Sequence, residues 1–201
     1  MLLDYGATTS TERMIRWYLR WRHSKGFGVH SPYAYRFVED VLKEGHYGYY
    51  SYEELFRYLK PDEIHDSKLV RRVRFIIRVS IFLKTKRIVA AGTAGRVAEL
   101  SAKALKISFI NIKKEGIVKF REGDFLIMGG KVTPSLFIEE AIKKRIPVFA
   151  INIDQKSREI LERPLDRGLL LTDKNKLILI PREEMAYVAY NIKLNSSRHT
   201  L

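Results

Sequence analysis

The chain has 201 residues, 46% of them hydrophobic, and 37 Lys and Arg against 23 Asp and Glu give a net charge of +14. This length and apolar content suffice for a sizeable core in one globular unit. The absence of Cys excludes disulfides, thiolate catalysis and thiolate metal sites. No stretch approaches the roughly 20 uncharged apolar residues that span a bilayer, so we expect a soluble, cytoplasmic protein without a membrane span.

The excess of positive charge attracts polyanions such as nucleic acids. The basic residues, however, are dispersed from Arg13 to Arg198 instead of forming one block. Charge alone therefore leaves two interpretations open, contact with nucleic acid and simple solubility.

Residues 1–85 predict a helical prefix, which opens after a loose leader of about eight residues. Thr9 and Glu12 have capping-box spacing and predict a helix through about Ser24. The apolar positions of this helix recur at helical intervals and are expected to face the core: Met14, Trp17, Tyr18 and Trp21. Arg13, Arg16 and Arg20 lie on another face, either solvated or placed along phosphate.

Three more helices are predicted in the prefix. Ser31 followed by Pro32 is a helix-start signal, and the helix runs to about Glu44. A short helix starts at Ser51 and ends before Pro61, and a longer one covers residues 67–84. Three arginines of the longer helix are candidates for a basic surface: Arg71, Arg72 and Arg74.

The stretch at residues 86–100 predicts a buried strand, a glycine turn and a helix. The apolar run from Ile88 to Ala91 suits a parallel strand covered on both faces. Gly92 and Gly95 permit a tight turn and close approach of a ligand, and the following helix points unpaired N–H groups at the same place. The same residues also suit a turn that only packs a helix on a strand.

From residue 87 onward strands and helices alternate, which predicts an α/β unit over residues 86–194. Further strands are expected at residues 107–112, 124–128 and 147–153, with helices through about Arg145 and at residues 157–162. The polar connection at residues 173–176 predicts an antiparallel hairpin, and residues 187–194 predict a last strand. Residues 195–201 are expected to form a disordered tail.

Three residues are candidates for catalysis. Asp124 and Asp154 are expected at the ends of neighbouring strands, where two carboxylates can perform acid–base chemistry. His30 stands beside Ser31, but the serine serves better as a helix cap. Capping by the aspartates, and a structural role for His30 in bonding its loop to the α/β core, are the competing interpretations. The histidines are scattered, so we expect no metal site.

The order of these elements resembles a bacterial family of class I S-adenosylmethionine-dependent methyltransferase-like proteins. The resemblance depends on the string from Gly28 to Tyr33 in the helical prefix, the strand and turn at residues 88–95, and the C-terminal hairpin with its following strand. It covers most of residues 12–194. It implies an incomplete Rossmann-like sheet, mostly parallel with an antiparallel C-terminal hairpin, and a helical prefix packed on the core.

The resemblance also implies S-adenosylmethionine as cofactor. Its methionine part would lie at the turn formed by Gly92, Thr93, Ala94 and Gly95. This chain departs from the family in its acidic residues. The family has an Asp or Glu at the end of the first strand, where this chain has Ala90 and Ala91. A second acid would fall near Lys113 and Lys114, where Glu115 is the nearest carboxylate.

The chain is also short after the second strand. Residues 113–123 are too few for the helix, strand and helix of a complete fold. We therefore expect a methyltransferase-like protein with weak or lost cofactor binding, in which Asp154 or Asp124 would face the substrate if it is active. The alternative is a non-catalytic basic module that binds RNA or an acidic protein through Arg13, Arg16, Arg20, Arg71, Arg72 and Arg74. A third interpretation is a subunit whose sheet a partner completes.

Overall fold

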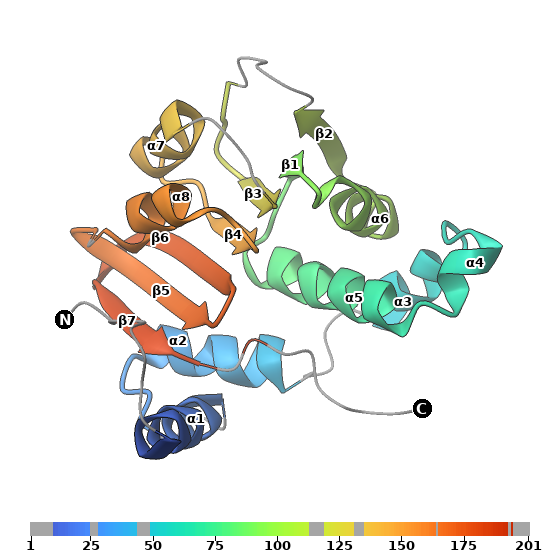
Figure 1. Ribbon diagram of the computed structural model, residues 1–201. Helices are drawn as coiled ribbons and strands as arrows, with labels where there is room; N and C mark the ends of the chain where they lie inside the picture. The colour runs from blue at the N-terminus through green and yellow to red at the C-terminus, as the bar shows by residue number, and fades with distance from the viewer. Residues whose placement is uncertain are drawn as a thin grey trace.

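A seven-stranded sheet with helices on both faces forms the centre of the computed structural model (Figure 1). The structure describes residues 10–24, 28–43, 49–112, 119–130, 135–163, 165–192 and 194. The whole predicted leader and the whole predicted tail at residues 195–201 lie outside this range.

The strands, in chain order, are β1 Arg87–Gly92, β2 Ser108–Ile112, β3 Asp124–Gly129, β4 Val148–Ile151, β5 Arg167–Asp173, β6 Lys176–Ala186 and β7 Val188–Asn191. Their order across the sheet is β2-β1-β3-β4-β6-β5-β7. Within the described sheet β6 alone runs against its neighbours, while β1 to β4 pair in parallel and β7 pairs in parallel with β5. The predicted α/β class, with a mostly parallel sheet and an antiparallel C-terminal hairpin, is confirmed.

Helices precede the sheet and then alternate with its strands. Before β1 come α1 Ser10–Ser24, α2 Pro32–Phe37, the π-helix η1 Val38–Leu42, α3 Tyr49–Phe56, α4 Pro61–Ile64 and α5 Ser67–Phe82. After β1 come α6 Gly95–Leu105, α7 Ser135–Lys143 and α8 Gln155–Glu162. The short helix α4 was not predicted, because its four residues carry no apolar periodicity.

Successive residues of the central strands face opposite layers of the core. Ile88 and Ala90 of β1 belong to a cluster with α2, η1, α5 and α6, whereas Val89 and Ala91 belong to a cluster with α7 and α8. Figure 1 shows the same arrangement, with α7 and α8 on one side of the sheet and α5 and α6 on the other. Both faces of β1 are thus covered, as its unbroken apolar run predicts.

The prediction that the aromatic face of α1 packs on the core is wrong. Met14 is 64% exposed, Trp17 54%, Tyr18 48% and Trp21 40%. The last turn of α1 holds the helix to the body: the Nδ1 atom of His23 lies 2.9 Å from the carbonyl oxygen of Asn191. Helical periodicity locates an apolar stripe, but it does not say what covers that stripe.

A membrane span is not found among the described helices, none of which is long and apolar enough to cross a bilayer.

Candidate functional site

The connection between β1 and α6 lies at the point where the order of the parallel strands changes direction. β2 pairs with one edge of β1 and β3 with the other, so the carboxyl ends of β1 and β3 meet there. In open α/β sheets this switch point is the usual ligand site. The turn predicted to hold a cofactor, Gly92 to Gly95, is at this place, with Gly92 at a φ of +69°.

The end of β3 fills much of this switch point. The backbone N–H of Thr93 donates to the carbonyl oxygen of Gly129 over 2.8 Å. A Cβ atom at Gly129 would lie 2.7 Å from Thr93 Oγ1 and 2.9 Å from the backbone nitrogen of Ala94. Gly129 therefore lets the β1–α6 turn pack directly on the neighbouring strand.

Gly95 accommodates a side chain from the other neighbouring strand. A Cβ atom there would lie 2.7 Å from the Nδ2 atom of Asn111, which projects from β2. Both glycines thus make room for parts of this chain. The close approach that the sequence suggested for a ligand is made here by protein atoms.

The space that remains at the switch point is a cavity of about 90 Å³, which we call the carboxyl-edge crevice. It lies between α5 and the carboxyl ends of β1, β3 and β4. Its polar lining residues are Arg71, Arg72, Thr93, Asn152 and Lys176. None of its lining residues is Asp or Glu.

The cations of the crevice are only partly neutralised. Burial lowers the pKa of Lys176, the charge of Arg72 lowers it further, and Asp173 opposes both. The Nζ atom of Lys176 donates to the carbonyl oxygen of Leu194 over 3.0 Å. Arg71 donates to the carbonyl oxygen of Ser67, and neither Arg71 nor Arg72 has a carboxylate partner among the described residues. The crevice is a place of positive potential.

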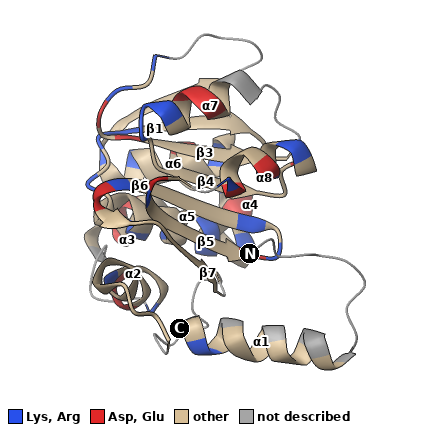
Figure 2. Cartoon of the chain, turned by 90° about the vertical axis from the view of Figure 1, so that its left-hand side faces the viewer, with Lys and Arg blue, Asp and Glu red and all other residues tan. Residues whose placement is uncertain are grey.

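Two more lysines are neighbours of these cations along the chain. Lys68 lies one turn before Arg72 on α5, and Lys174 lies in the β5–β6 turn, where Asn152 donates its backbone N–H to Asn175 over 2.8 Å. We call these residues the cation row: Lys68, Arg71, Arg72, Lys174 and Lys176. Figure 2 shows that Lys and Arg elsewhere are spread over many elements. What distinguishes the row is that three of its members, Arg71, Arg72 and Lys176, line one crevice.

Only two of the six predicted basic contact residues belong to the row, Arg71 and Arg72. Arg74 is half-buried and its guanidinium lies 5.1 Å from the ring centroid of Tyr52 and 5.8 Å from that of Phe56. Arg74 is therefore packed against aromatic rings on a different face of α5. The side chains of Arg13, Arg16 and Arg20 lie outside the described residues.

The expected carboxylate pair does not form, because Asp124 and Asp154 lie at opposite edges of the sheet. Asp124 begins β3 instead of ending it, and its carboxylate binds Arg87 through Nε at 2.7 Å and Nη2 at 2.5 Å. Asp154 follows the carboxyl end of β4 and caps α8, accepting from the backbone N–H of Ser157 over 2.9 Å. That hydrogen bond lowers the pKa of Asp154, so its carboxylate is fixed as a cap.

His30 joins its loop to the sheet through backbone atoms. Its N–H donates to the hydroxyl of Tyr190 over 3.2 Å, and the N–H of Ser31 donates to the same oxygen over 3.3 Å. The imidazole is exposed. Ser31 caps α2 as predicted, accepting from Ala34 over 3.3 Å. These bonds attach the loop to β7, and no hydrogen bond of the His30 imidazole is found among the described residues.

Sequence reasoning missed Lys176 and Asn152. The predicted hairpin turn at residues 173–176 was a signal for Lys176. This turn follows β5, which runs in the same direction as β4, so it lies at the carboxyl ends of the parallel strands. Within the described residues no group of three or more His, Asp or Glu side chains is placed to hold a metal ion. Lys113, Lys114 and Glu115 lie outside them.

Comparisons of the chain with protein-family models, with curated proteins and with solved structures found no match. The geometry of the site therefore carries the functional argument.

Proposed function

We propose that this chain is a non-catalytic RNA-binding protein, built on a methyltransferase-like, Rossmann-like sheet whose cofactor cleft is closed. The observation that carries the proposal is the carboxyl-edge crevice, which is lined by Arg71, Arg72 and Lys176 and by no carboxylate.

The strand order supports the choice of this edge as the binding edge. The strand order β2-β1-β3-β4 is the one expected for part of a doubly wound sheet whose switch point lies between β1 and β3. The connection from β2 to β3, residues 113–123, is too short for a further crossover unit. In the family that the sequence resembles, this region covers the adenine of the cofactor, so a chain without it lacks part of the nucleoside pocket.

S-adenosylmethionine does not fit the residues at this edge. Pockets that hold ligands of its size have volumes of roughly 300–1,000 Å³, whereas the crevice has about 90 Å³. The resemblance calls for an acid at the end of the first strand, and β1 has the buried Ala90 and Ala91 there. Thr93 and Ala94 of the turn pack directly on Gly129, which fills the space beside the turn. No methyl-transfer step is therefore assigned to this chain.

The cation row is suited to a polymer of phosphates. Arg71, Arg72 and Lys176 line the crevice and can bind one phosphate there. Lys68, one turn before Arg72, and Lys174, two residues before Lys176, are available to further phosphates of the same strand. Arginine also stacks on bases, which favours single-stranded RNA over a smooth acidic protein surface. An acidic protein partner is the competing outcome of the test.

The test is fluorescence anisotropy with a labelled single-stranded RNA oligonucleotide at several salt concentrations. Each phosphate contact adds about 0.7 to the slope of log K against log salt for a single strand. The double variant Lys68→Gln with Arg72→Gln is expected to bind the RNA at least about tenfold more weakly and to lower this slope by about 1 to 2.

The matched control is Lys103→Gln with Lys144→Gln, which removes the same charge near the C-terminal ends of α6 and α7, at the other edge of the sheet. It should bind RNA like the parent chain. Equal losses in the two double variants, no RNA retention near physiological salt, or full displacement of RNA by polyglutamate at matched charge would overturn RNA as the partner.

Calorimetry tests the closed cleft separately. Titration with S-adenosylmethionine or S-adenosylhomocysteine is expected to give no saturable heat at micromolar concentrations, because the turn is filled. Micromolar binding of either nucleoside would contradict the closed cleft. It would not decide whether the chain binds RNA, which the anisotropy of the two double variants tests separately.

A further inference from the structure

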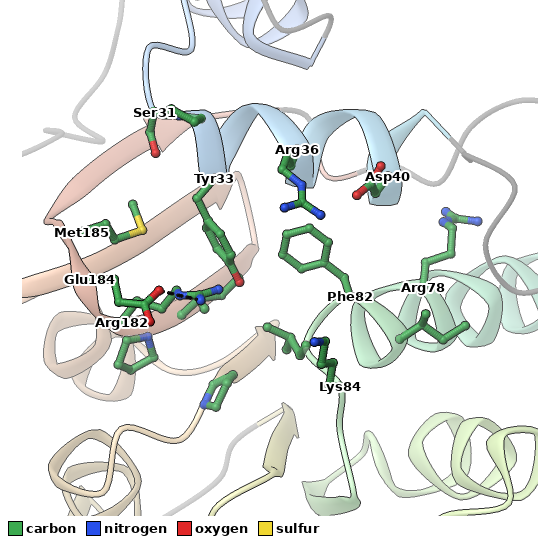
Figure 3. Close-up of a pocket in the computed structure, with 16 residues that line it drawn as sticks. Ser31, Tyr33, Arg36, Asp40, Arg78, Phe82, Lys84, Arg182, Glu184 and Met185 are labelled. Carbon is green, nitrogen blue, oxygen red and sulfur yellow. Dashed lines mark hydrogen bonds and ion pairs between the residues drawn. The ribbon is translucent and has the colours of Figure 1, made fainter.

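A groove of about 890 Å³ lies at the opposite, amino-terminal edge of the sheet (Figure 3). We call it the amino-edge groove. The residues that carry the argument are Tyr33, Arg36, Phe82, Lys84, Arg182 and Met185. They come from α2, the end of α5 and the second half of β6. Its volume is within the range of pockets that hold small molecules, and the RNA proposal makes no use of it.

An irregularity of the β5–β6 hairpin builds one wall of the groove. Gly168 pairs with Pro181, but the preceding Arg167 pairs with Ala186, so residues 182–185 are left out of the register between β5 and β6. Three residues of this bulge line the groove, Arg182, Glu184 and Met185. Bulges commonly redirect side chains toward functional sites.

Gly168 is what allows this bulge. Its φ is +141°, and a Cβ atom there would lie 2.7 Å from the carbonyl oxygen of Ile180. A side chain at this position would push β6 away at the point where the wall begins, so the wall depends on this glycine.

The opposite wall comes from the string that carried the family resemblance. Ser31 caps α2 and Pro32 starts it, which places Tyr33 in the groove. The Tyr33 ring lies 5.1 Å from the ring of Phe82, centroid to centroid. Arg182 lies 4.4 Å from the centroid of the Tyr33 ring and pairs with Glu184 at 3.0 Å. Two aromatic faces and a fixed guanidinium thus stand together, as Figure 3 shows.

Positive charge exceeds negative charge around these rings. Arg36 and Lys84 are exposed in the groove and have no carboxylate partner among the described residues. Arg78 is buried at one end, where it donates to the carbonyl oxygen of Val41 over 2.7 Å. Of the two acids in the lining, Glu184 is paired with Arg182, which leaves Asp40 to oppose the remaining cations.

We propose that the amino-edge groove binds a small aromatic organic anion, with its ring packed against the Tyr33 and Phe82 pair and its acidic group toward Arg36 and Lys84. The apolar walls bury the ring, and the cations select the charge. Burial raises the pKa of the Tyr33 phenol, so it stays protonated, and its hydroxyl is hydrogen-bonded with Arg182.

The experiment uses 1-anilinonaphthalene-8-sulfonate, an aromatic sulfonate whose fluorescence rises on binding, with the full chain. We expect one saturable site, and the double variant Arg36→Gln with Lys84→Gln is expected to bind the probe about tenfold more weakly. The uncharged analogue without the sulfonate should bind weakly to both proteins. Hydrogen–deuterium exchange with the probe present should protect residues 31–36 and 181–185.

The control for charge is Lys103→Gln with Lys156→Gln on α6 and α8, neither of which lines the groove. It should keep the affinity of the parent chain. Circular dichroism and thermal melting confirm that each variant is folded. Equal affinity of the groove variant and the control, several probes per chain, or protection confined to α1 would overturn the proposal, since the exposed aromatic residues of α1 are the other surface that attracts such a probe.

Discussion

A glycine near the start of a helix can allow close contact with a ligand or close contact with another segment of the same chain. At Gly129 the nearest neighbours of a hypothetical Cβ include the backbone nitrogen of Ala94, which cannot turn away. At Gly95 the nearest neighbour is the amide of Asn111, an exposed side chain that can rotate. The two glycines of one site therefore differ in how strictly the structure requires them.

This difference predicts unequal effects of alanine. Gly129→Ala is expected to lower the free energy of unfolding by about 1–3 kcal/mol, because the turn must shift off the strand. Gly95→Ala is expected to change it by less than about 0.5 kcal/mol, since helix propensity offsets the displaced amide. Urea denaturation of both variants measures the two values, and a more harmful Gly95→Ala would contradict the packing described for the turn.

Which residues form the site could be predicted only where local chemistry decides it. Gly92 was placed correctly at the end of β1 because a strand followed by glycine is a local pattern. Asp154 was recognisable as a cap for the same reason. Asp124 was misplaced because its bond to Arg87 joins residues 37 positions apart, and Lys176 reaches the crevice only through the pairing of β6 with β4.

At the scale of elements, sequence periodicity gave the bounds of helices and central strands more readily than their partners. The second half of β6 was missed because Pro181 and three charged residues interrupt its apolar pattern. The bounds of α1 agree with the prediction to within a residue, yet its aromatic face lies in solvent. Amphipathic spacing is the same whether the apolar stripe meets the core or another molecule.

The exposure of α1 is testable because both tryptophans of the chain are in it, Trp17 and Trp21. We expect red-shifted fluorescence, typical of indole in water, and efficient quenching by acrylamide and iodide in the native state. Unfolding in urea should then change the emission maximum little. A blue-shifted native spectrum that shifts on unfolding would show that the aromatic face is covered in solution.

At the scale of the whole molecule, two ion pairs among the described residues link the helical prefix to the α/β unit, Arg96 with Glu63 and the more exposed Lys106 with Glu54. Arg96, in the first turn of α6, holds Glu63 of α4 through Nε at 2.7 Å and Nη2 at 2.5 Å. Arg96 also binds Glu99 of its own helix at 3.1 Å. The order of the strands, by contrast, depends on pairings between segments that are distant in the sequence, and no local pattern encodes them. The sequence therefore predicted a mostly parallel sheet but not which strands are neighbours in it.

The link between α4 and α6 makes stability depend on pH in a definite direction. The hydrogen bonds from Arg96, with a backbone bond from Lys60, lower the pKa of Glu63 from 4.5 to about 2. A carboxyl group with a lower pKa in the folded state stabilises the fold above its unfolded pKa, and this contribution is lost as the pH falls from 4.5 toward 2.

Glu63→Gln is therefore expected to lower the free energy of unfolding by about 1 kcal/mol at pH 7, the upper range for a partly exposed but bidentate pair. The difference from the parent chain should shrink steadily between pH 4.5 and pH 2, because the parent carboxylate becomes protonated there. Urea denaturation at several pH values measures it. Glu39→Gln, whose partner Lys43 is one turn away on the same helical segment, is the control and should change little at pH 7. A pH-independent difference for Glu63→Gln would mean that Gln disturbs packing instead of removing a charge that joins the two parts of the chain.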